Sequence, residues 1–431
     1  MPYALFTALP FVGHLNPLLR QAEELQKRGW RVAVASTREM ADHCARESPA
    51  IPFVNLGTLG DTIQELRAAE AAATVDPDYR RGGMRFLPVL GKIWPVMFDG
   101  LVAAVASDRP SILIVDIFSW AGVDAAEATG VTFALNNPSL LTGVPQGLLA
   151  PAPGVPMMTT GQSIHDIGWL QRTAEPLLRG LMALGIRFTV LRGVNALRRT
   201  RGLPNTTLEA PLRGRQILVN GAFGLEYVRP LPANVEMVGP MLAEDVPPLP
   251  PDLERWLSDG PPVIYTNMGT VSANSTEQLG RIANGIAVEG MRALWIVRPP
   301  HADRIPRPLP QSVKLMDWVP SPRAVLAHPN VRVFVSHCGI NSVHESLAAG
   351  TPVVGIPMLA DQRDMAARVA DAGVGLWLDK SRFTTAQLRD AIAKVSTDSA
   401  FRDRIPALQK AFAKAGGVKR AADLIERAAA Q

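Results

Sequence analysis

Cysteine is scarce in this sequence, which has only Cys44 and Cys338 among 431 residues. Two cysteines so far apart exclude a scaffold held by several disulfides and a zinc site built from cysteine pairs. This usage is typical of a reducing compartment. The N-terminus also lacks a basic region followed by a cleavable apolar core. We therefore expect a cytoplasmic protein.

Long uninterrupted apolar runs are also missing. Arg85, Lys92 and Asp99 interrupt the best candidate for a membrane span, so we expect no span. The sequence contains no basic tract and no nucleic-acid-binding motif, and we expect no nucleic-acid partner. The 44 basic and 39 acidic residues leave a formal charge of +5. That balance suits an anionic ligand, but a solvated basic surface explains it equally well.

The length and the order of predicted elements indicate two α/β domains. A chain of 431 residues is long enough for two cores, and the dense proline cluster GPMLAEDVPPLPP lies at residues 239–251. Strands and helices alternate on both sides of it. We predict two doubly wound, Rossmann-like parallel-sheet domains facing each other across a cleft, at residues 1–240 and 252–410, with a linker at 241–251.

The chain start predicts a βαβ unit and a candidate base. The pattern indicates a strand at Tyr3–Leu9, a loop, a helix at Pro17–Arg28 with Asn16 as its N-cap, and a strand at Arg31–Ala35. His14 falls in the loop, at the carboxyl edge of the sheet where such folds bind ligands. Its pKa near neutrality suits a general base. The loop lacks the glycines of a dinucleotide fingerprint, which disfavours a dehydrogenase.

A second strand offers a partner for this histidine. The stretch SILIVDIFSWAG reads as an apolar strand that ends at Asp116. A carboxylate can fix the tautomer of a catalytic histidine and stabilise its charged form. The alternative is that Asp116 only caps the following turn.

An anion site is predicted where the apolar run Val331–Val335 gives way to the turn HCGINS and a helix expected at Ser342–Ala349. A helix N-terminus offers unpaired backbone N–H groups and a partial positive charge, which favour phosphate. A glycine would let the backbone approach the ligand, and three side chains could donate to it; these residues are Gly339, His337, Asn341 and Ser342. The alternative is an ordinary tight turn beside a half-buried histidine. Thr270, in the turn after another predicted strand, is a second candidate for the diphosphate.

Further polar and aromatic residues flank this turn. Trp318 could stack on a base, although a lone tryptophan is more often part of a core. Glu345, placed on the first turn of the helix, could accept from the two hydroxyls of a ribose. Asp361 and Gln362 follow the strand predicted at Val353–Ile356 and suit a ring of sugar hydroxyls. Together these residue types describe a site for a nucleotide sugar.

From Trp318 to Gln362 the chain closely resembles the donor-binding signature of family 1 glycosyltransferases, the UDP-glycosyltransferases, including natural-product enzymes of bacteria and plants. The resemblance implies the two-domain GT-B fold, with a last helix at about 411–431 that packs back on the first domain. It implies that Trp318 stacks on uracil and that the Val319 backbone pairs with the base edge. The remaining implied roles are the diphosphate for His337, Asn341 and Ser342, the ribose for Glu345, and the sugar hydroxyls for Asp361 and Gln362.

The resemblance also implies a reaction in which His14, held by Asp116, deprotonates an acceptor hydroxyl. We expect an inverting, metal-independent transferase that moves a hexose, with glucose from UDP-glucose as the expected donor, in a monomer or weak dimer. The apolar segment from Leu140 to Leu184, with Met157, Met158 and Trp169, would lie over an acceptor such as a flavonoid, polyketide or terpenoid; these side chains could instead simply pack the helices. The alternative function is a catalytically silent sugar-nucleotide-binding or activator protein of the same fold.

Several positions depart from the family pattern or could mislead. Ser321 stands where many members have glutamine, the segment from Trp318 to His337 is one residue longer than the usual plant pattern, and Ile340 replaces a common tryptophan. The first two put a ribose contact in doubt, and the third leaves the identity of the sugar open. The Asp-x-Asp in VDPDYRR, residues 75–81, resembles a manganese motif of other glycosyltransferases. Its polar context favours a solvated loop instead.

Overall fold

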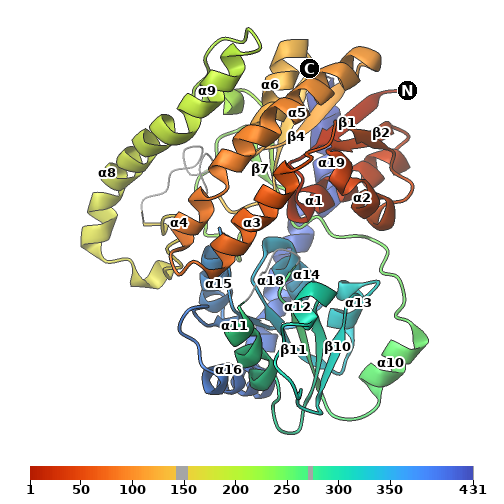
Figure 1. Cartoon of the computed structure of the whole chain (residues 1–431), viewed down its shortest axis with the longest axis vertical. Coiled ribbons are helices and arrows are strands. Elements are labelled where there is room, and N and C mark those ends of the chain that lie inside the picture. Colours follow the sequence, from red (N-terminus) through yellow and green to blue (C-terminus); the bar gives the residue numbers. More distant parts are fainter. Residues whose placement is uncertain (142–153, 270–274, 431) are drawn as a thin grey trace.

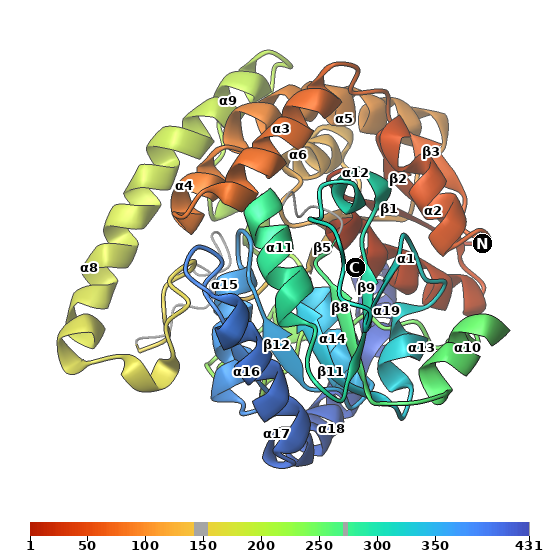
Figure 2. The ribbon, with the colours of Figure 1, turned by 60° about the horizontal axis from the view of Figure 1, so that its bottom comes forward.

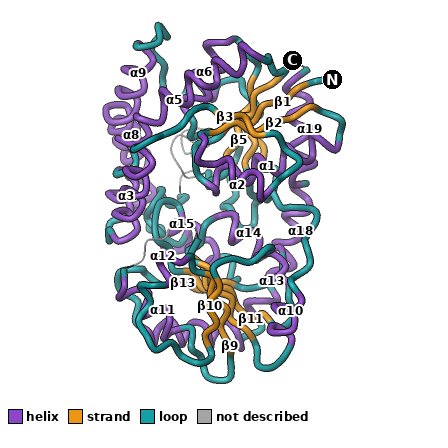
Figure 3. The backbone as a smooth tube through the Cα atoms, turned by 45° about the vertical axis from the view of Figure 1, so that its right-hand side comes forward, coloured by secondary structure: helices purple, strands orange, loops and turns teal. Residues whose placement is uncertain are grey.

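The computed structural model describes residues 1–141, 154–269 and 275–430, and within them the strands form two parallel sheets (Figure 1). The seven-stranded sheet has the order β3-β2-β1-β4-β5-β6-β7 and the six-stranded sheet the order β10-β9-β8-β11-β12-β13. Figure 3 shows them as two separate groups of strands. The first sheet contains β1 (Tyr3–Thr7), β2 (Arg31–Ser36), β3 (Phe53–Asn55), β4 (Ile112–Asp116), β5 (Phe133–Asn137), β6 (Ile217–Val219) and β7 (Val235–Met237). The second contains β8 (Val263–Asn267), β9 (Arg292–Ile296), β10 (Val313–Met316), β11 (Val331–Ser336), β12 (Val353–Gly355) and β13 (Gly375–Trp377).

Helices cover both faces of each sheet. Those that precede β8 are α1 (Val12–Lys27), η1 (Arg38–Met40), α2 (Ala41–Glu47), α3 (Thr62–Val75), α4 (Tyr79–Met84), α5 (Leu87–Ser107), α6 (Trp120–Thr129), η2 (Ile164–Asp166), α8 (Trp169–Ile186), η3 (Arg187–Leu191), α9 (Arg192–Arg199), η4 (Ala210–Leu212) and α10 (Pro251–Ser258). Those that follow it are α11 (Thr276–Gly285), α12 (Pro299–Ala302), α13 (Pro322–Ala327), α14 (Ile340–Ala348), α15 (Gln362–Asp371), α16 (Thr385–Thr397), α17 (Ala400–Asp403), α18 (Ile405–Ala415) and α19 (Gly417–Ala429). The predicted GT-B class of architecture is therefore present.

The sheets are apolar on both sides because each face packs against helices, as is usual for parallel sheets. Along β1, Leu5 joins a core with α5 and α6, whereas Phe6 joins a core with α1 and α19. In the second sheet, Tyr265 packs toward α14 and α15, and Ile264 packs toward α11 and α16. The carboxyl ends of both sets of strands point into the space between the sheets.

The last helix of the chain covers the first sheet although α18 covers the second. α19 packs on α1, β4 and β5 (Figure 3). The single helix expected at about 411–431 is divided, since α18 ends at Ala415 and Gly416 and Gly417 have φ values of 93° and 60°. Left-handed backbone ends a helix, and glycine adopts it without steric cost. The Gly417 N–H donates to the carbonyl of Val238 at 2.7 Å, which joins this return to the end of the first sheet.

The helices α3 to α5 bear on two sequence expectations. The segment Arg81–Ser107 is long and apolar enough by length and composition to cross a membrane, and 39% of its most apolar window is buried in the structure; its inner side packs on α6 and α3. The stretch at residues 75–81 is only partly solvated, since Val75, Pro77, Asp78 and Arg81 are exposed whereas Asp76 and Tyr79 are buried. Asp76 is buried and accepts from Arg81 and Arg85, and the Tyr79 hydroxyl donates to the Pro357 carbonyl of the other sheet's domain at 2.9 Å.

Candidate active site

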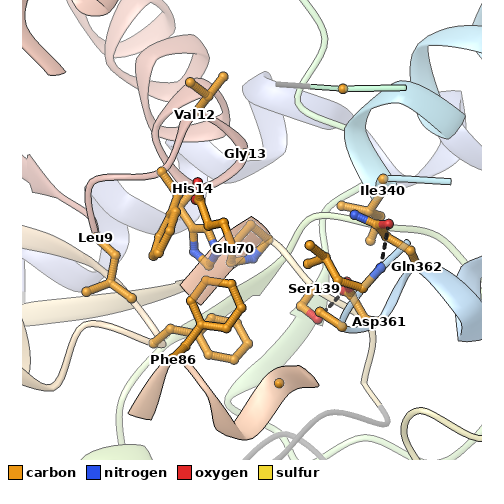
Figure 4. A pocket seen from close by; sticks show the side chains of 18 of the residues that line it. Leu9, Val12, Gly13, His14, Glu70, Phe86, Ser139, Ile340, Asp361 and Gln362 are labelled. Carbon is orange, nitrogen blue, oxygen red and sulfur yellow. Dashed lines mark hydrogen bonds between the residues drawn. The ribbon is translucent and has the colours of Figure 1, made fainter. Parts of the chain in front are cut away.

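A cleft of about 1950 Å³ lies between the two sheets. Ten of the twelve predicted site residues line it: His14, Trp318, Val319, His337, Gly339, Asn341, Ser342, Glu345, Asp361 and Gln362. Figure 4 shows His14 on one side and Asp361 and Gln362 on the other. Asp116 lies behind His14, and Thr270 lies outside the described residues. Residues more than 300 positions apart in the sequence thus share one cavity.

His14 lies in the first turn of α1 rather than in a loop before it. The helix begins at Val12 with Phe11 as its N-cap residue, and Asn16, predicted as the N-cap, instead accepts from His43 Nε2 at 2.7 Å. The predicted start was too late because Pro17 was taken to mark the N1 position, whereas it is the sixth residue of α1. The helical setting fixes the imidazole on the cleft side of α1.

Pro17 has a consequence for the site. It sits inside α1, has no backbone N–H, and so cannot bond the carbonyl four residues earlier, which is that of Gly13. The Gly13 carbonyl instead accepts from Asn341 Nδ2 of the opposite domain at 3.0 Å. A helix irregularity next to His14 therefore provides a contact across the cleft.

His14 and Asp116 form a hydrogen-bonded pair. The Nδ1 atom of His14 lies 2.7 Å from Oδ2 of Asp116, whose side chain is fully buried, whereas the imidazole remains 27% exposed. Burial lowers the pKa of His14, but the carboxylates of Asp116 and of Asp361 raise it above its ordinary value overall. The rings of Phe11 and Phe118 pack beside the imidazole at 5.6 and 5.4 Å between centroids. This geometry directs Nε2 toward the cleft.

The turn after β11 holds His337 in a narrow space. A Cβ atom at Gly269 or Gly339 would lie 2.7 or 2.4 Å from the imidazole, so both positions require glycine. Cys338 adopts φ 60°, which a residue other than glycine rarely does. Burial lowers the pKa of His337 to about 4, and its buried Nδ1 has no hydrogen-bond partner among the described residues. The side chain is therefore a neutral hydrogen-bonding group at pH 7.

The helix that follows begins earlier than predicted. α14 starts at Ile340, with Gly339 as the N-cap residue, so Asn341 and Ser342 belong to its first turn. Glu345 consequently lies in the second turn, not the first as expected from the sequence. Burial, and the nearby carboxylate of Glu47, raise the pKa of Glu345 to about 7. A ligand that donates hydrogen bonds to this carboxylate would favour its ionised form.

Trp318 is exposed rather than part of a core. Its relative accessibility is 57%, in the cleft just after β10, whereas Val319 is buried. An exposed indole beside the phosphate turn is available for stacking. Ser321 does not line the cleft: its hydroxyl accepts from the Ala324 N–H at 3.1 Å and caps α13. This position, where the family often has glutamine, therefore has a structural role here.

Asp361 and Gln362 begin α15 and face the first domain (Figure 4). One carboxylate oxygen of Asp361 accepts from the Ser139 hydroxyl at 2.7 Å. The side-chain carbonyl of Gln362 accepts from the backbone N–H groups of Met358 and Leu359 at 2.9 and 3.1 Å. Since these bonds use the Gln362 oxygen, its NH₂ group is the part suited to a ligand.

The part of the cleft next to His14 is mostly apolar. Residues of α3, α4, α5, α6, α8 and α9 line it, and Figures 1 and 2 show α8 and α9 at the outer edge of the molecule. Met157 and Met158, predicted for this wall, line it. Trp169 does not: it is 72% exposed at the start of α8. Residues 142–153 of the predicted segment lie outside the described part. Other lining side chains include Phe86, Leu90, Trp94, Phe118, Met182 and Val194.

Some lining residues were missed by the sequence analysis. Glu70 of α3 is the only carboxylate among the described lining residues of α3 to α9, and burial raises its pKa to about 7. Arg298 and Ser139 follow β9 and β5 and also line the cleft. Both residues could have been predicted, because ligands of such sheets bind at the carboxyl ends of the strands. Nothing in the local sequence distinguishes Glu70 from other helical glutamates.

Comparison with known proteins gives a family for this architecture. The model described as "UDP-glucoronosyl and UDP-glucosyl transferase" matches residues 193–413, just over half of the chain. The chain belongs to this family. The matched range contains the second sheet and all ten donor-side residues predicted from the sequence, including Thr270.

Individual members of the glycosyltransferase family are distant in sequence. UDP-glycosyltransferase 1 of Phaeomoniella chlamydospora is 27% identical over 81% of this chain and 75% of its own length. The mouse 2-hydroxyacylsphingosine 1-beta-galactosyltransferase is also 27% identical, over 72% of this chain, but only 58% of its own length is covered. Among solved structures, the kitacinnamycin glycosyltransferase has a TM-score of 0.70 at 21% identity, with 99% of both chains covered. That likeness establishes the shared fold.

Proposed function

We propose that the protein is an inverting, metal-independent glycosyltransferase that moves a hexose from a UDP-sugar to a hydroxyl of an apolar small molecule. One observation carries the proposal: the His14–Asp116 pair faces Trp318, His337, Glu345 and Asp361 across a single cleft. A protein that only binds nucleotide sugars has no need of a histidine with a buried carboxylate behind it. The family supplies the transferase chemistry that such a pair would serve.

In this proposal His14 acts as the general base. Its Nδ1 is bonded to Asp116, so Nε2 is the atom that accepts the hydroxyl proton of the acceptor. The acceptor oxygen forms a bond to the anomeric carbon as the bond from that carbon to the diphosphate oxygen breaks. UDP leaves with the electron pair, and attack from the opposite face inverts the anomeric centre. The buried Asp116 stabilises the imidazolium that forms.

The second domain would stabilise the leaving UDP. The start of α14 presents backbone N–H groups, with Ser342 and the neutral His337 beside them. Asn341 now donates to the Gly13 carbonyl, so phosphate binding by its Nδ2 would exchange that bond for a charge-assisted one. Trp318 and Glu345 would hold the uracil and the ribose, and Asp361 and Gln362 the hexose hydroxyls.

The acceptor class is inferred from the wall beside His14. Aromatic and aliphatic side chains and two methionines line it, and such linings suit aromatic or polycyclic ligands of varied shape. A flavonoid, polyketide or terpenoid with a free hydroxyl is the class we propose. UDP-glucose is the proposed donor, and cytoplasmic location remains part of the proposal.

A donor-by-acceptor screen read by mass spectrometry tests the function directly. We expect a mass gain of one hexose on phenolic or alcoholic apolar acceptors with UDP-glucose. Transfer only to free sugars or peptides would contradict the acceptor class. UDP-sugar binding without transfer to any acceptor would favour the catalytically silent alternative.

Chelation provides a separate prediction. Transfer is expected to keep its rate in excess EDTA, because the helix start at α14 and the neutral donors beside it are assigned the stabilisation of the diphosphate. The Asp-x-Asp at residues 76–78 already has other partners, since Asp76 accepts from Arg81 and Arg85. The measurement is the initial rate before and after dialysis against EDTA. A loss of activity that manganese restores would refute metal independence.

A further inference from the structure

Lys380 is a buried cation that the proposed reaction does not use directly. It follows β13 and has no solvent exposure. Its Nζ donates to the carbonyls of Thr74 at 2.8 Å and Ala73 at 3.2 Å, and also to the carbonyl of Met358. These three acceptors match the three N–H groups of an ammonium ion. A charge buried in this way is costly unless its partners are held in place.

Two of these acceptors belong to α3, a helix that contributes to the apolar part of the cleft next to His14. Ala73 and Thr74 lie in the last turn of α3, where helix carbonyls have no intrahelical partner and carry a partial negative charge. A lysine ammonium is a favourable cap for such a turn. Glu70, one turn earlier, lines the cleft near His14 (Figure 4). The cap is unusual because it comes from the opposite domain.

The third acceptor belongs to the loop that leads to the predicted hexose contacts. Met358 lies between β12 and α15, only three residues before Asp361. The neighbouring Pro357 carbonyl accepts from the Tyr79 hydroxyl of the first domain, and Nζ of Lys380 lies 4.4 Å from the centre of the Tyr79 ring. Lys380 and Tyr79 therefore each donate a hydrogen bond to this loop and also contact each other.

We propose that Lys380 is a positioning residue that ties the acceptor-side helix α3 to the hexose-side loop 357–362. The tie fixes the distance between the acceptor side and the hexose side of the cleft, although Lys380 itself does not line the cleft. The expected effect of this tie on turnover rests on the proposed glycosyl transfer.

The charged form of Lys380 is the one that can make all three bonds. Burial lowers its pKa to about 8, with Arg363 acting in the same direction, while Asp76 and Asp379 raise it. The ammonium form therefore predominates at pH 7. Replacement by methionine keeps much of the volume of the side chain and removes all three donors.

The test compares Lys380→Met with Lys92→Met. Lys92 is a matched control because it also contacts α3, through an exposed ion pair with Glu65 at 2.6 Å, and such pairs contribute little. We expect Lys380→Met to lose on the order of 10²-fold in kcat, since displacing bound reactants by about 1 Å costs that much. UDP affinity, measured by calorimetry, should change little in either variant, while UDP-glucose affinity should fall only in Lys380→Met.

The outcomes separate positioning from general stability. Equal kcat in Lys380→Met and Lys92→Met, or a loss explained entirely by the folded fraction, would overturn the tie. Should Lys380→Met not fold, Lys380→Gln decides, because its side-chain amide has only two N–H donors and cannot bond all three carbonyls: lower kcat at unchanged UDP affinity supports the tie, and unchanged kcat overturns it. A wild-type protein without transferase activity would refute the proposed function instead. In that case amide hydrogen exchange tests the tie. Exchange in α3 (Thr62–Val75) should be faster in Lys380→Met than in the wild type.

Discussion

His14→Ala is expected to lower the turnover of hexose transfer by about 10²–10⁴-fold, the usual contribution of a general base. The acceptor hydroxyl then loses Nε2 of His14, the atom that is assigned to take its proton. UDP affinity should change little, because His14 belongs to the first domain while the predicted nucleotide contacts belong to the second. Steady-state kinetics with UDP-glucose and a phenolic acceptor, together with calorimetry of UDP, provide the two measurements.

His165→Ala is the control for this experiment. His165 is exposed in η2 and does not line the cleft, so its removal should leave both measurements unchanged. If His14→Ala turned over at nearly the wild-type rate, the base assignment would be wrong. A parallel loss of UDP affinity would instead show that the variant had disturbed the whole cleft.

Asp116→Asn is expected to reduce turnover by about 10²–10⁴-fold, with little change in the shape of the side chain. The amide can present an NH₂ group to Nδ1 of His14, which would favour the tautomer with its proton on Nε2. That tautomer cannot accept a proton from the acceptor. The buried imidazolium also loses the carboxylate that stabilises it, now 2.7 Å away.

The same substitution should move the pH profile of the residual activity. The base works only when Nε2 is unprotonated, so the rate falls as the pH falls through the pKa of His14. Asp116 raises this pKa against the effect of burial. In Asp116→Asn the pKa is therefore lower, and the acidic limb of the profile should shift to lower pH while the plateau drops. An acidic limb at the wild-type position would contradict coupling between the two residues.

Much of the fold could be predicted because the strands are buried on both faces. The strands predicted at Arg31–Ala35 and Val353–Ile356 match β2 and β12 to within one residue, and the strand before His14 was located to within two residues. Apolar runs of this kind need little information from the rest of the chain. The phosphate turn could be found for a similar reason, since a strand, a glycine and a helix start follow one another locally.

The parts that could not be predicted depend on contacts between the domains. The bond from Asn341 to the Gly13 carbonyl requires knowing that Pro17 lies inside a helix and that α14 faces it. The capping of α3 by Lys380 joins positions about 300 residues apart. A polar, turn-rich segment has the same local sequence pattern whether water or another domain covers it.

The two places where the chain passes between the sheets lie side by side. The outgoing segment begins after Val238 and Gly239, and the returning one runs through Ala415 and Gly417, whose N–H bonds the Val238 carbonyl at 2.7 Å. A Cβ atom at Gly239 would lie 3.1 Å from that of Ala415. One crossing would allow the domains to swivel, but two adjacent crossings resist twist and leave bending as the free motion. We therefore expect any opening of the cleft to bend about this pair of crossings.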